Sequence, residues 1–72
     1  MRLEIKSEIA GVIWQVVANA GQTVEKDEQL VIIESMKMEI PVLAVENGLV
    51  QEIRVKEGDE IAEGQILVVL TA

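Results

Sequence analysis

The sequence predicts an all-β fold in which two small antiparallel sheets pack face to face. Short apolar runs rich in β-branched residues recur along the 72 residues, and glycine-containing turn segments separate them. No stretch of ten or more residues places apolar side chains at the i, i+3, i+4 and i+7 positions of an amphipathic helix. The chain also divides into two related halves, and we expect each sheet to draw strands from both.

An internal repeat relates the two halves at an offset of 37 positions without a gap. The aligned positions share glycine or apolar character, and they include Gly11 with Gly48, Gly21 with Gly58, Leu30 with Leu67, and Val31 with Val68. Such agreement over residues 8–35 and 45–72 indicates a duplication. The alternative is that short β segments with glycine turns resemble one another in unrelated proteins.

The first strand of each half is expected at residues 12–17 and 49–55. Alternation of period two predicts that every second residue of the later strand shares one face, namely Leu49, Gln51, Ile53 and Val55. Trp14 aligns with Gln51 in the repeat. We expect Trp14 to lie on the same face of its strand as Val12 and Val16, as a partly buried core residue.

Glycines mark sharp corners after these strands. Gly21 and Gly58 each precede a segment with a single apolar residue that we expect to plug into the core, namely Val24 and Ile61. Gly64 is expected to take a positive φ before the last strand. Its repeat partner is Asp27, and aspartate is one of the few other residues that tolerate the left-handed region.

Lys37 lies at the midpoint of the chain between two methionines. Apolar runs at residues 30–33 and 40–43 flank it, each with the length and β-branched content of a buried strand. Lys37 is therefore predicted at the tip of a hairpin, where a flexible stem presents its ammonium group to another macromolecule. Pro41 marks the strand after the hairpin as an edge strand.

The repeat places this hairpin opposite both ends of the chain. An offset of 37 carries Lys37 to positions 0 and 74, just beyond the first and last residues. If a pseudo-twofold axis relates the halves, the hairpin occupies the place that the two chain ends occupy in the other half. We expect Lys37 and the chain ends at opposite poles.

Composition argues against several kinds of site. The chain has neither cysteine nor histidine, so a thiolate metal site, a disulfide and a hydrolytic triad are excluded, and we assign no catalytic or metal-ligating residue. Thirteen acidic and six basic residues give a net charge of -7, with no basic run to bind a phosphate backbone. We do not expect nucleic-acid binding.

Length and hydropathy predict one small domain over residues 1–72. Nowhere do about 18 consecutive apolar residues occur, so no membrane segment is expected. We predict a monomeric, cytoplasmic protein. Whether it is freestanding or a domain of a longer polypeptide stays open at this point.

The chain closely resembles biotinyl and lipoyl attachment domains, and more specifically the biotin carboxyl carrier type, over essentially its whole length. The resemblance rests on Met36-Lys37-Met38, on the Gly-x-x-Val and Gly-x-x-Ile corners at Gly21 and Gly58, and on the two-half β organisation. It implies a flattened β-sandwich, the barrel-sandwich hybrid, with two four-stranded antiparallel sheets related by a pseudo-twofold axis.

The resemblance also implies a function, because Met36-Lys37-Met38 matches the family's biotinylation motif and Lys37 its modified lysine. A biotin protein ligase would attach biotin there, and the biotin would shuttle carboxyl groups between biotin carboxylase and carboxyltransferase sites. The chain would then be a non-catalytic carrier of a biotin-dependent carboxylase or transcarboxylase. Met36 and Met38 would flank the site as its recognition motif, or cap the sandwich core. Glu34 and Glu39 would aid ligase recognition or serve as solvated charges.

Two departures from the family pattern define the alternatives. Ser35 stands where the biotin family more commonly has alanine. Lipoyl domains typically carry aspartate before the lysine and alanine after it, whereas this chain has Met36 and Met38, so lipoate on Lys37 is the second interpretation.

A third interpretation is an unmodified β-sandwich module that docks a partner through its acidic surface. The chain also lacks the protruding loop that some bacterial biotin carriers have in their first half.

Overall fold

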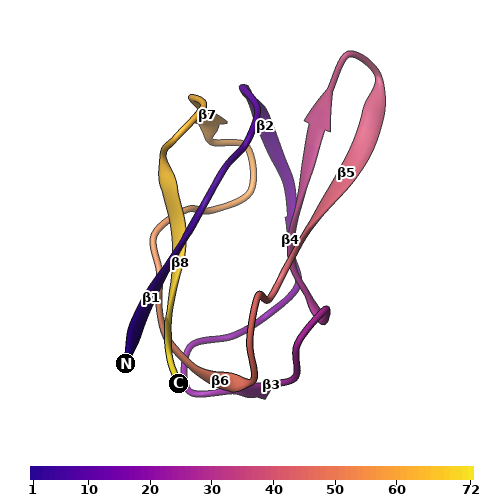
Figure 1. Cartoon of the computed structure of the whole chain (residues 1–72). Coiled ribbons are helices and arrows are strands. Elements are labelled where there is room, and N and C mark those ends of the chain that lie inside the picture. The colour runs from indigo at the N-terminus through magenta and orange to yellow at the C-terminus, as the bar shows by residue number, and fades with distance from the viewer.

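A computed structural model describes all 72 residues and consists of two four-stranded antiparallel sheets (Figure 1). The strands are β1 (Arg2–Lys6), β2 (Gly11–Val16), β3 (Thr23–Val24), β4 (Gln29–Ser35), β5 (Met38–Leu43), β6 (Gly48–Ile53), β7 (Glu60–Ile61) and β8 (Ile66–Thr71). One sheet has the order β1-β8-β6-β3 and the other β5-β4-β2-β7. The structure contains no helix, and so it has no helix long and apolar enough to cross a membrane. The prediction of two such sheets, each with strands from both halves, is confirmed.

Strand pairing repeats at the same offset of 37 residues as the sequence. The central pairs are Ile13 with Ile33 and Val50 with Leu70, and the outer pairs are Ile33 with Ile40 and Leu70 with Leu3. β1 is therefore the counterpart of β5. In the pairing, residues 1–35 correspond to residues 38–72, and only Met36 and Lys37 lie between them.

The core lies between the two sheets and consists almost entirely of isoleucine, valine and leucine. Val24 and Ile61 are 1% and 5% exposed, so both corner segments plug into the core as predicted. The corners themselves also agree with prediction, because Gly21, Gly58 and Gly64 have positive φ and so does Asp27, at 71°.

Two β-bulges overturn the predicted alternation in the first strand of each half. β2 slips against β4 between Ile13 and Gln15, and β6 slips against β8 between Val50 and Glu52. Because a bulge inserts one extra residue, period-two alternation does not hold across it. Leu49 is 43% exposed whereas Val55 is buried, so the prediction that these residues share a face was wrong.

Trp14 is the bulged residue of β2, and its side chain is 46% exposed. The prediction that it is a core residue was therefore wrong. Trp14 directly follows buried Ile13, so ordinary alternation already turns its side chain outward, on the same face as exposed Val12. The bulge changes the alternation only after Trp14, where Gln15 is exposed and Val16 is half-buried.

We expect Trp14→Gln, which installs the residue found at the equivalent bulge position 51, to change the free energy of unfolding by about 0.5 kcal/mol or less. Trp14 is the only tryptophan, so its fluorescence reports on this site alone. Acrylamide should quench that fluorescence readily in the folded protein. Blue-shifted, poorly quenched emission would show that Trp14 is buried after all.

The molecule is elongated, with principal extents of 32 × 17 × 17 Å. Figure 1 shows the β4–β5 hairpin at one end of the long axis and residues 1 and 72 at the other. There the Met1 ammonium donates a hydrogen bond to the Ala72 carbonyl oxygen at 2.7 Å, and the Ala72 amide donates to the Met1 carbonyl at 2.8 Å. The predicted opposition of hairpin and chain ends is confirmed. Pro41 lies on edge strand β5, also as predicted.

Candidate functional site

Lys37 lies at the tip of the β4–β5 hairpin, where the sequence predicted it. Ser35 pairs with Met38, which leaves Met36 and Lys37 as a two-residue loop. Both loop residues have positive φ, at 52° and 64°. Positive φ at both positions is the backbone pattern of a type I′ turn, the tightest connection between twisted antiparallel strands.

The turn holds two residues that disfavour its backbone conformation. Type I′ turns favour Asn-Gly because glycine has no Cβ and the short amide of asparagine can hydrogen-bond locally in the left-handed region, whereas Met36 and Lys37 have a Cβ and no such short polar group. The left-handed region costs an ordinary residue about 1–2 kcal/mol. Sequence reasoning missed the turn type, because its usual signal is absent here. Backbone strain of this kind is typical of functional sites.

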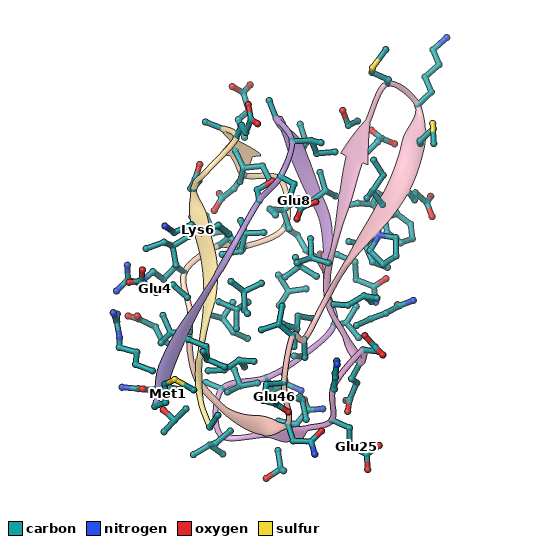
Figure 2. All side chains as sticks on the ribbon, in the orientation of Figure 1. Met1, Glu4, Lys6, Glu8, Glu25 and Glu46 are labelled. Carbon is teal, nitrogen blue, oxygen red and sulfur yellow. The ribbon has the colours of Figure 1, made fainter.

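The side chains of the turn are almost fully in solvent. Met36 is 91% exposed and Met38 is 62% exposed, and Lys37 is exposed between them. In Figure 2 the side chains at this tip project away from the sandwich. The alternative that the two methionines cap the core was therefore wrong. Apolar side chains that fold into no core are available for contact with another molecule.

Lys37 forms neither an ion pair nor a side-chain hydrogen bond. Glu34 and Glu39 lie directly opposite each other, one pair below Ser35 and Met38, and both are exposed. Like charges placed directly opposite across two strands destabilise a sheet. The hairpin therefore presents a free amine above two carboxylates that the fold itself does not require.

The ion pairs of the molecule belong to the other sheet. Arg2 pairs with Glu4 and Arg54 pairs with Glu52, each at 2.7 Å. The hydrogen bond to Glu52 raises the pKa of the Arg54 guanidinium. The two glutamates of the hairpin have no such cationic partner.

β2 packs tightly against β4 just below the turn. A Cβ atom on Gly11 would lie 2.6 Å from the Glu34 carbonyl oxygen and 2.8 Å from Ile33 Cγ2, so only glycine fits there. Ile33 itself is buried in the core. The exposed turn is thus mounted on two strands whose lower parts are fixed by packing.

Together these features present one accessible primary amine on a short turn that extends from a rigid sandwich. A lysine amine can form an amide or an imine with an activated carbonyl compound. An exposed tip also allows an enzyme to enclose the amine from several sides. The geometry suits covalent modification by another macromolecule.

Known proteins resemble this chain over nearly its whole length. The biotin/lipoyl family model, described as "Biotin-requiring enzyme", matches residues 1–70. The "Biotin/lipoyl attachment protein" of Bacillus subtilis is 42% identical over 69 residues, which cover 96% of this chain and 94% of that protein. The "Biotinylated protein TB7.3 homolog" of Mycobacterium leprae is 39% identical over 71 residues, covering 99% of this chain and all of that protein.

Solved structures show the same fold in two settings. The urea carboxylase of Kluyveromyces lactis matches 99% of this chain with a TM-score of 0.94 and 35% identity, although the chain spans only 6% of that enzyme. The lipoyl domain of the 2-oxoglutarate dehydrogenase complex from Azotobacter vinelandii matches 88% of the chain, and 80% of that domain, with a TM-score of 0.75 and 35% identity.

Proposed function

The chain belongs to the biotin/lipoyl attachment family, and within that family we propose that it is a non-catalytic biotin carrier whose biotin is attached to Lys37. The observation that carries the proposal is the isolated Lys37 amine on a strained two-residue turn, between two methionines that the core does not use. Folding accounts for none of these three features, whereas recognition by a modifying enzyme accounts for all of them.

Biotin is favoured over lipoate by two observations. Met36 and Met38 occupy the positions where lipoyl domains typically carry aspartate and alanine. The TM-score is also higher for the urea carboxylase structure, at 0.94, than for the lipoyl domain, at 0.75. One full-length relative is itself named a biotinylated protein. Lipoate on the same lysine is the second candidate, because the lipoyl domain shares the fold.

The residues of the hairpin fit covalent biotin. Lys37 Nζ is accessible, so it can attack the carboxyl carbon of biotin adenylate bound in a biotin protein ligase; the N–C bond forms, AMP leaves, and the amine loses a proton. Met36 and Met38 would fill apolar pockets of the ligase, and Glu34 and Glu39 would face basic groups on it. Biotin, once attached, supplies a ureido nitrogen that carries a carboxyl group.

The contribution of the chain after modification is mechanical. The packed sandwich holds the turn at one pole, so the attached group can reach sites in biotin carboxylase and carboxyltransferase partners while the body of the domain stays outside. The net charge of -7 favours partners with basic surfaces and should speed their encounter at low salt.

Mass spectrometry of the intact chain tests the proposal. Co-expression with a biotin protein ligase should add one biotinyl group to the wild type and none to Lys37→Ala. Lys26→Ala serves as the matched control, because Lys26 is also exposed on a turn but lies outside the hairpin. Its backbone amide donates a hydrogen bond to Asn47 Oδ1, and the substitution leaves that amide in place. A parallel reaction with a lipoyl ligase separates the two cofactors. An unmodified wild type would contradict the proposal.

A further inference from the structure

The edge strands β1 and β5, each taken with the two residues that follow it, occupy equivalent places in the repeat but differ in kind at three exposed positions. Three charged positions of the first half align with three apolar positions of the second: Glu4 with Pro41, Lys6 with Leu43, and Glu8 with Val45. All six are exposed, Leu43 by 39% and Val45 by 57%. Because the fold accepts charges at these places in one half, folding does not require apolar residues there in the other.

The same two segments border a groove of about 580 Å³ along the side of the sandwich where β1 and β5 face each other. Its lining includes Ile5 and Ile33, which are buried in the core. The charged rim consists of Glu4, Lys6 and Glu8, and Figure 2 shows them in this order along the path toward the hairpin end. The apolar rim consists of Pro41, Leu43 and Val45.

The groove begins next to the hairpin. Ile33 and Ile40 both line it, and they pair with each other two positions below Ser35 and Met38. Two strand residues rise by about 7 Å. A group joined to Lys37 through the lysine side chain and the five-carbon chain of biotin lies about ten bonds, or about 12 Å, from the Lys37 Cα. The attached ring can therefore fold back to the groove.

We propose that the groove between β1 and β5 is a resting site for the biotin attached to Lys37, an inference that depends on the proposed function. The hydrocarbon chain lies on Ile40 and Val42 and against Leu43, where it removes apolar surface from water. The polar ureido ring faces the charged rim across the groove. The volume falls within the range of about 300–1,000 Å³ that is usual for small-molecule sites.

Nuclear magnetic resonance on the biotinylated and unmodified full chain tests this site. We expect nuclear Overhauser effects between biotin protons and the methyl groups of Ile40, Val42 and Leu43. Biotinylation should also shift the amide signals of residues 4–8 and 40–45, in addition to those of the turn. Shifts confined to residues 35–39, with no contact between biotin and these methyl groups, would overturn the proposal.

The repeat provides a variant that should fold. The double substitution Leu43→Lys and Val45→Glu installs the residues of the equivalent positions Lys6 and Glu8, and it should abolish the contacts to biotin without changing the degree of biotinylation. Leu49→Lys is the control, because Leu49 is similarly exposed, at 43%, but does not line the groove. Loss of the contacts in the control as well would contradict a specific site.

Two other occupants of the groove predict different results. If a second copy of the chain covered the apolar rim, unmodified protein would show concentration-dependent shifts at residues 40–45 and slower diffusion, and the proposal would be wrong. If a partner protein used the rim, the attached biotin would leave the groove signals unchanged, which also contradicts it. Intact mass, measured first, shows whether biotin is attached at all and so separates failure of this inference from failure of the proposed function.

Discussion

Replacing Gly11 with alanine is expected to lower the free energy of unfolding by about 2–3 kcal/mol. The added Cβ would lie 2.6 Å from the Glu34 carbonyl oxygen and 2.8 Å from Ile33 Cγ2, so β2 and β4 must separate to admit it. A chain of this size has a total stability of about 4–11 kcal/mol, so the loss is large. Thermal unfolding should show a Tm lower by about 10–20 °C.

Two other glycines give the controls for this prediction. Gly48→Ala should cost about as much, because its Cβ would lie 2.7 Å from the Thr71 carbonyl oxygen in the equivalent pair of strands. Gly58 has no atom within 4 Å of the added Cβ, but its φ is +91°, so Gly58→Ala should cost about 1–2 kcal/mol from backbone strain alone. If Gly11→Ala cost no more than Gly58→Ala, close packing of β2 against β4 below the turn would not limit stability.

Local rules were enough to predict the hairpin and the corners. Lys37 was placed at a tip because two apolar β segments flank it, and the φ values of Gly21, Gly58 and Asp27 followed from which residues tolerate the left-handed region. Each of these predictions depends on a few adjacent residues. Tertiary packing did not have to be known.

The bulges could not be predicted in this way. Trp14 and Gln51 are ordinary strand residues with no glycine beside them, so the sequence carries no sign that an extra residue is inserted at either place. The bulges lie next to Ile13 and Val50, which are buried in the core, on strands that also pair on their other side with β7 and β3. The position of each bulge therefore depends on packing between the two sheets, and the residues of a single strand do not reveal that packing.

The groove was hidden from the sequence for a different reason. The repeat is recognisable over residues 8–35 and 45–72 because glycine and apolar positions agree there, but β1 and β5 differ in the residues that line the rim. Their equivalence is established by the strand pairing, where Leu3 pairs with Leu70 as Ile40 pairs with Ile33. In β1 and β5 the two halves share a backbone arrangement but differ in their exposed side chains. Such a difference is expected where one half has a function that is separate from folding.

Replacing Met36 with asparagine is expected to weaken recognition by the biotin protein ligase while it stabilises the fold. Asparagine tolerates the left-handed φ of 52° at this position, so Met36→Asn should raise the free energy of unfolding by about 1 kcal/mol. The same substitution removes a methionine whose burial in a ligase pocket would contribute about 1.5–3 kcal/mol. The kcat/KM for biotinylation should therefore fall by about 10–100-fold.

Thermal unfolding and ligase kinetics on the same protein samples separate the two effects, with Asp27→Asn as the matched control. Asp27 also has a positive φ, of 71°, but lies on a turn that is not part of the hairpin, so its substitution should leave the ligase kinetics unchanged. A more stable Met36→Asn protein that is biotinylated at the wild-type rate would show that the ligase does not read Met36. A less stable one would show that the turn is not strained. Opposite changes would mean that the residue is kept at the tip for its partner, against the preference of the backbone that carries it.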